Sequence, residues 1–145
     1  MLIVIMFVIL SIIDFSIFTA ADNEKPPKHV AEQLLKYLNI LYPKDKPINP
    51  VKSTPPYSSR VYKDEVNEFF RIVDIYTKDT IYDRGRIFHL KYNHEKIAKA
   101  NWKQIKQMLA LLSSHVKFAS FNDPSGIESC HVKMILLRIK ELVEQ

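Results

Sequence analysis

The segment KSTPPYSSRVYKDEV (residues 52–66) marks a change from one type of local structure to another. Five prolines lie between Pro43 and Pro56, and a helical pattern of apolar residues begins soon after them, at Tyr62. Proline fixes φ and has no amide donor, so residues 43–56 are predicted to form an extended, largely solvated strap. At about 3.1 Å per residue, this strap would span on the order of 40 Å. The segment therefore predicts a stiff linker that leads into a helix.

Amphipathic patterns lie on both sides of the strap. In HVAEQLLKYLNILY (residues 29–42), apolar residues recur at helical spacing, and Pro43 ends the predicted helix. Residues 57–79 predict a second helix, with Ser58 or Ser59 as its N-cap. After Phe70 this second segment is rich in β-branched residues, which leaves a change to strand open.

The C-terminal half shows a mixture of patterns. Strict alternation predicts a strand over residues 87–92, and a second strand is predicted over 116–121. Residues 97–112 have helical spacing, the NDPSG segment (122–126) predicts a turn, and residues 128–143 fit either a helix or a strand. We expect an α+β fold. It has two N-terminal amphipathic helices joined by a proline-rich strap, then a small antiparallel β-rich arm with one or two further helices.

The first 21 residues form a separate unit. The apolar run MLIVIMFVILSII is too short to cross a bilayer and is followed by small residues, which predicts a signal peptide cleaved after Ala21. The alternative is an uncleaved membrane anchor, which is less favourable because Asp14 would lie at membrane depth. We therefore expect a secreted, extracellular protein without a membrane segment after cleavage. Residues 22–56 would hold the first helix and the strap, and residues 57–145 the second helix and the arm.

The charge and the single cysteine limit the choice of partners. The net charge is +5, but the lysines are scattered, which argues against nucleic acid and leaves an acidic extracellular polysaccharide as a candidate partner. Cys130 has no second cysteine in the chain to pair with. It is either the site of an intermolecular disulfide or a buried free thiol.

No motif for catalysis or metal binding is present in the sequence. The five histidines are spread along the chain without metal-ligand spacing, and GxSxG, HExxH and phosphate-loop motifs are missing. Cys130 and His131 are neighbours in sequence, which is not how a catalytic Cys–His pair is arranged. We expect no enzyme activity, no cofactor and no metal site.

The order of segments resembles the N-terminal propeptide of the transforming growth factor-β superfamily, especially the bone morphogenetic protein branch. In that family a helix with a Leu-Leu pair, here Leu34-Leu35, precedes an extended strap and a Pro-Pro segment that opens a second helix. Residues 55–63, PPYSSRVYK, match this second piece, and RGRIFHLKYNHEKIAKA and SCHVKMILL are similar to later arm segments. The chain departs from the family in its helix-like NWKQIKQMLALL segment. It also lacks an Arg-x-x-Arg cleavage site and the cystine-knot growth factor domain.

The resemblance implies a propeptide-like protein that binds, helps to fold and can hold latent a growth factor domain or another secreted protein. An apolar face would then insert into a groove on that partner. The residues implied in partner binding are Val30, Leu34, Leu35, Leu38, Leu41, Tyr57, Val61 and Tyr62. This hypothesis predicts a first helix that packs poorly on its own chain and a sheet that pairs residues 87–92 with 116–121.

Two other classes of protein stay open. A small secreted helical protein of cytokine-like or effector type, acting by protein binding, would form a compact bundle that buries the 30–41 face internally. A secreted carrier of an apolar ligand would need an enclosed cavity lined by aromatic residues.

Overall fold

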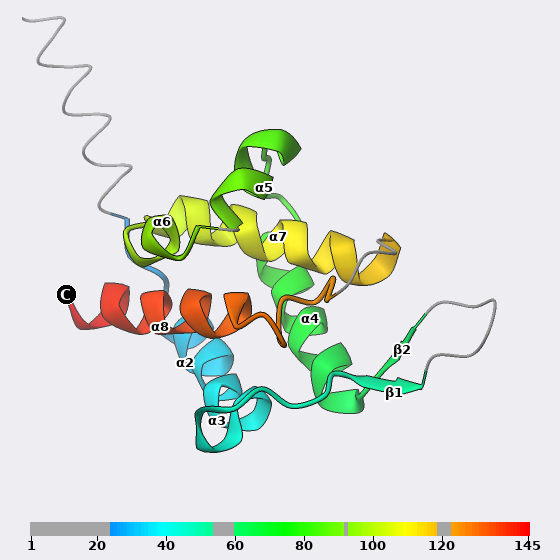
Figure 1. The fold of residues 1–145 in the computed structure, drawn as a ribbon. Coiled ribbons are helices and arrows are strands. Elements are labelled where there is room, and N and C mark those ends of the chain that lie inside the picture. The colour runs from blue at the N-terminus through cyan, green and yellow to red at the C-terminus, as the bar shows by residue number, and fades with distance from the viewer. Residues whose placement is uncertain (1–23, 54–59, 92, 119–122) are drawn as a thin grey trace, which may run out of the picture.

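The computed structural model describes residues 24–53, 60–91, 93–118 and 123–145, which form mainly helices (Figure 1). A short antiparallel sheet of two strands accompanies the helices, so the α+β expectation holds in its coarse form. Among the described residues, no helix is long and apolar enough to cross a membrane. In chain order the elements are α2 (Lys28–Leu35), α3 (Tyr37–Leu41), the 3₁₀ turn η1 (Pro43–Asp45), β1 (Val51–Ser53), β2 (Val61–Tyr62), α4 (Asp64–Thr77), α5 (Arg84–Lys91), α6 (His94–Ala98), α7 (Trp102–Phe118) and α8 (His131–Glu144).

Four helices enclose the core. Helices α7 and α8 lie side by side. Helix α2 packs against α8, helix α4 packs against α7, and α2 and α4 also contact each other (Figure 1). Buried apolar side chains from all four helices form one cluster, which includes Leu34, Phe69, Leu112 and Ile135. Burial of this apolar surface is the main favourable contribution to the free energy of folding.

The first predicted helix is confirmed, as α2 and α3. Its apolar face is directed into the core: Val30, Leu34 and Leu41 are all buried. The prediction that this helix packs poorly on its own chain is therefore wrong. The physical reason is that α8 and α4 provide the apolar surface that so short a helix needs in order to be stable.

The strap does not run straight on from the end of α3. After Pro43, Lys44 and Asp45 adopt positive φ values of 53° and 63°, and the chain folds back so that the Ile48 amide donates to the Leu41 carbonyl. Strand β1 then pairs with β2, a strand pair that projects from the helices in Figure 1. The prediction of an extended backbone is wrong at residues 43–45, which form a 3₁₀ turn, whereas the prediction of a largely solvated segment is confirmed, because most residues from 43 to 52 are exposed. Each proline removes only its own amide, so the residues between the prolines still form hydrogen bonds. Residues 54–59 lie outside the described residues.

The second predicted helix is confirmed as α4, one uninterrupted helix from Asp64 to Thr77, but its predicted start is wrong, because Val61 and Tyr62 form strand β2. Its N-cap residue is Lys63, and the predicted caps Ser58 and Ser59 lie outside the described residues. The β-branched residues after Phe70 stay helical, because Ile72 and Val73 are buried in the core. Tertiary packing here overrides strand propensity.

The β-rich arm is replaced by helices. Residues 87–91 belong to α5, and residues 116–118 end α7, so both predicted strands are wrong in their described parts. Tyr92 and residues 119–121 lie outside the described residues. Asp83, the residue before α5, caps the helix: its carboxylate accepts from the Arg86 amide and its carbonyl accepts from the Ile87 amide. This cap favours a helix from Arg84 onward. An alternating pattern of only six residues is too short to exclude a helix.

The predicted 97–112 helix is divided into two helices by a cap. Helix α6 ends at Ala98, and α7 begins at Trp102 after Asn101. Asn101 Oδ1 accepts from the Gln104 amide at 2.8 Å, and Gln104 Oε1 accepts from the Asn101 amide at 3.0 Å. This reciprocal pair is a capping box, which starts a new helix.

The predicted turn before α8 is confirmed over residues 123–126. Gly126 has φ +73°, and a Cβ atom there would lie 2.9 Å from Leu112 Cδ2. The segment left open between helix and strand is helical, as α8.

Tyr42 fastens the turn to the first helices. Its buried hydroxyl donates to the Ile127 carbonyl at 2.9 Å and accepts from the Lys133 amide at 3.1 Å. Burial raises the pKa of Tyr42 well above its ordinary value, against the opposing effect of the hydrogen bond from the Lys133 amide. Tyr42 thus joins the end of α3, the turn and the start of α8.

Candidate functional site

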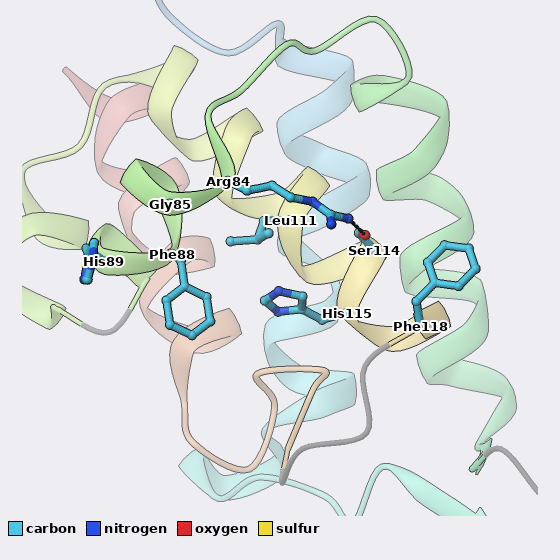
Figure 2. Close-up of a pocket in the computed structure, with 8 residues that line it drawn as sticks. All are labelled: Arg84, Gly85, Phe88, His89, Leu111, Ser114, His115 and Phe118. Carbon is cyan, nitrogen blue, oxygen red and sulfur yellow. Dashed lines mark hydrogen bonds between the residues drawn. The ribbon is translucent and has the colours of Figure 1, made fainter.

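An open groove of about 400 Å³ lies between α5 and the C-terminal half of α7 (Figure 2). The groove is open to solvent and does not form an enclosed cavity. Its lining is mainly apolar or aromatic, with one arginine and two histidines. The lining residues are Arg84, Gly85, Phe88, His89, Leu111, Ser114, His115 and Phe118.

The two helices present the lining side chains in different ways. In α5, Ile87 is buried in the core, while the next residue, Phe88, is 38% exposed. In α7, Leu111 is buried and contributes apolar surface to the groove, while Phe118 at the helix end is 82% exposed. Large apolar side chains are thus held at the surface by helices whose other faces are anchored in the core.

Aromatic rings meet across the groove. The centroids of Phe88 and His115 are 6.1 Å apart, with an interplanar angle of 72°. Figure 2 shows these two side chains approaching each other from α5 and α7. Edge-to-face contacts of this kind favour a defined ring orientation, so Phe88 is oriented before any partner binds.

Arg84 extends over the groove from the start of α5. Its Nη2 donates to Ser114 Oγ at 2.9 Å, so the guanidinium group reaches from one helix to the other (Figure 2). A second polar contact, near the C-terminal end of α7, is the ion pair between Lys117 Nζ and Asp74 Oδ2 at 2.7 Å. The groove is therefore apolar with a cation at one end.

The groove has the features of a noncovalent binding site. Among the residues that the structure describes, no group of three or more His, Cys, Asp or Glu side chains lies close enough to hold a metal ion. An open groove with exposed aromatic residues and a guanidinium group can bury apolar side chains and pair with an anion. The absence of an enzyme activity stays a prediction.

The residues predicted to bind a partner do not form a common surface. Val30, Leu34, Leu41 and Tyr62 are buried, and Leu35 and Leu38 are half-buried against the core. Val61 is exposed on β2, and Tyr57 lies outside the described residues. In this conformation the first helices offer no continuous apolar face to another protein.

Cys130 lies just before α8. Its side chain is half-buried and packs against the core, and the residue has a positive φ of 64°. Its sulfur lies 3.9 Å from the Glu128 carbonyl oxygen. Partial exposure is compatible with either state of the thiol, and an intermolecular disulfide stays a prediction.

Two of the segments that line the groove are predicted from the sequence as strands. Phe88 and His89 lie in the strand predicted over residues 87–92 and Phe118 in the one predicted over 116–121, whereas Leu111 lies in the predicted helix. The segment RGRIFHLK (84–91) has no apolar stripe at helical spacing. Asp83 just before it and Gly85 within it are residue types that disfavour a strand, and this is the signal that could have identified the helix. A helix without an apolar stripe leaves some of its large side chains at the surface.

The comparisons with known proteins give no relative. No protein-family model, no curated protein and no solved structure matches the chain.

Proposed function

We propose that this protein is a small secreted helical protein that acts by binding another protein through the α5–α7 groove. The observation that carries the proposal is the exposure of Phe118 and Phe88 beside an apolar groove. Phe69, Phe70 and Trp102, by contrast, are buried in the core. Exposed aromatic side chains are the residues that most often contribute the binding energy of protein interfaces.

The shape of the groove favours a protein segment over a small apolar ligand. Sites for small ligands are clefts or cavities that bury most of the ligand surface. This groove is open along its length, so a small molecule would stay largely in water. A protein segment covers the rest of the groove with its own surface, and for this reason the carrier hypothesis is less favourable.

The growth-factor propeptide hypothesis has less support than this proposal. It assigns partner binding to Leu34 and Leu41, which are buried inside the chain's own core. Helices α2 and α3 would have to leave α8 and α4 before they could enter a groove on a growth factor. That release would expose a large apolar surface on both parts of the molecule, which is unfavourable.

Secretion is part of the proposal and rests on residues 1–21. The apolar run and the small residues before Ala21 support a cleaved leader. The test is to express the full chain in secretory cells and determine the N-terminus of the protein in the medium. An N-terminus at Asp22 supports the proposal, while a protein that stays in the cells with residues 1–21 intact contradicts it.

The binding test is a selection of displayed, randomised 12-residue peptides against the purified protein. We expect selected peptides to lose binding when the groove is changed by Phe118→Ala or filled by Gly85→Phe. The matched control is Leu137→Ala, because Leu137 is an exposed apolar residue on α8 that does not line the groove. Peptides that bind all three variants and the native protein equally would overturn the proposal.

A further inference from the structure

We propose that the partner segment carries a carboxylate beside its apolar anchor residue, and that Arg84 binds this carboxylate. The inference rests on the proposed function, since it specifies the chemistry of the segment that enters the groove. Three features of the groove support it: its charge, the position of Arg84 and the glycine next to Arg84.

The charge of the groove is one-sided. Arg84 is the one permanently charged side chain among its eight lining residues, which include no carboxylate. Of the acids near Arg84 in sequence, Asp83 caps α5 by accepting from the Arg86 amide, and Asp74 pairs with Lys117. Asp79 lines a different hollow, together with Lys78, Lys103 and Lys106. Among the described residues, no carboxylate forms an ion pair with Arg84. A partner with an acidic group would supply the missing counter-charge.

Arg84 is held in position before a partner binds. The hydrogen bond to Ser114 Oγ uses one of the five N–H donors of the guanidinium group. It also keeps the group beside Leu111 at the edge of the groove (Figure 2). A planar guanidinium can bind a carboxylate through two parallel hydrogen bonds. Because the side chain is already restricted, less conformational entropy is lost on binding.

Gly85 leaves the space beside Arg84 open. Gly85 is the second residue of α5, and its backbone does not require glycine: φ is not positive, and a Cβ atom would meet Asp83 Oδ1 at 3.5 Å, which is ordinary contact. Alanine at such a position would favour folding, because it restricts the unfolded chain. The glycine does line the groove. Its missing side chain allows the backbone of a partner segment to come close to the guanidinium group.

The apolar lining argues for an acidic peptide segment and against an acidic polysaccharide. A polysaccharide binds by many dispersed charges, whereas this groove offers one arginine beside an apolar lining that includes Phe88, Leu111 and Phe118. A peptide combines a carboxylate and an apolar side chain within two or three residues. The expected sequence in the partner is therefore Asp or Glu close to a large aliphatic or aromatic residue.

The experiment is a double-mutant cycle with one of the selected groove-binding peptides. Fluorescence anisotropy gives the Kd of the peptide and of its Asp→Asn or Glu→Gln form, with the native protein and with Arg84→Gln. We expect each single change to weaken binding roughly tenfold, as for a hydrogen bond to a charged group, and the two changes together to add little more. Arg84→Lys should restore part of the affinity. Arg86→Gln, which removes an exposed charge on the same helix outside the groove, is the control and should leave Kd unchanged.

The failures of the inference and of the proposed function can be told apart. If Arg84→Gln and the neutral peptide bind as tightly as the originals while Phe118→Ala still abolishes binding, the acidic partner is wrong and the groove stands. If binding ignores both Phe118→Ala and Gly85→Phe, the proposed function fails together with the inference. A heparin oligosaccharide that binds through Arg84 and is unaffected by Phe118→Ala would also overturn the peptide proposal.

Discussion

Helices α2 and α3 bury their apolar residues in the core, whereas α5 leaves a large apolar residue at the surface. In α2 and α3 the regular apolar positions, such as Leu34 and Leu41, are buried against other helices. In α5, Ile87 is buried, while its neighbour Phe88 faces the groove. The regular pattern, which suggested a surface for a partner, is part of the protein's own core. The irregular pattern marks the surface that is available to a partner.

The difference has a simple physical cause. A short amphipathic helix is marginal in water and is stable only when its apolar stripe is covered. In a chain that folds alone, the nearest cover is another helix of the same chain. A strong periodic stripe is therefore evidence for an internal contact first, and an exposed aromatic residue outside such a stripe is better evidence for an external one.

The largest effect should follow from a change in α3. Leu41 is fully buried and its neighbour Ile40 is 42% exposed, so the two residues form a matched pair. Leu41→Ala should lower the free energy of unfolding by about 2–5 kcal/mol, because it removes buried methyl groups and leaves a cavity. Ile40→Ala should lower it by less than about 1 kcal/mol. Urea denaturation of both variants measures this, and equal, small losses would mean that α3 does not pack on the core.

The two glycines of the chain give the second test. Gly126→Ala should lower the free energy of unfolding by about 1–3 kcal/mol, because φ is +73° and the new Cβ would clash with Leu112. Gly85→Ala should instead raise it by about 0.5–1 kcal/mol, since the α5 backbone has an ordinary φ and the Cβ has space. Thermal unfolding by circular dichroism compares the two variants. A destabilising Gly85→Ala would show that α5 needs glycine for its fold, and would remove one support for an open groove.

The third prediction concerns Tyr42. At neutral pH, Tyr42→Phe should lower the free energy of unfolding by about 1–2 kcal/mol, because the Ile127 carbonyl and the Lys133 amide each lose a partner. The substitution should also change the alkaline response. Burial raises the pKa of Tyr42 above the value of about 10 for an exposed tyrosine, so above pH 10 the unfolded chain loses the phenolic proton first. The native protein then loses stability as the pH rises.

The variant without this hydroxyl should lose stability less steeply above pH 10. Tyr37 and Tyr62 also have raised pKa values through burial and keep part of the slope. Urea midpoints at intervals between pH 8 and pH 11.5 measure the difference. Parallel curves for the native protein and Tyr42→Phe would mean that Tyr42 is exposed to water in solution.

The sequence carries enough information for most of the helices and for little of their arrangement. Helices α2, α3, α4 and α7 follow from apolar spacing, and α3 ends two residues before Pro43, as expected. The strand prediction for residues 87–91 failed because six alternating residues are too few to outweigh a cap at Asp83. The groove could not be derived, because it depends on which side of α5 faces α7, and that is decided by the burial of Ile87.

The smallest effect on stability, with the largest expected effect on binding, belongs to Phe118. Phe118→Asp should change the free energy of unfolding by less than about 0.5 kcal/mol, because the Phe118 side chain is 82% exposed and buries little apolar surface in the folded protein. The same substitution removes an aromatic contact and adds a negative charge beside the site proposed for a carboxylate. It should therefore weaken a groove-binding peptide more than Phe118→Ala does, because like charges repel. Urea midpoints and anisotropy titrations of the two variants give both quantities.

If Phe118→Asp binds no worse than Phe118→Ala, the partner brings no negative charge to that end of the groove. If it unfolds the protein instead, Phe118 belongs to the core, and the contrast between the buried stripe of α2 and α3 and the exposed aromatic residues of the groove is lost.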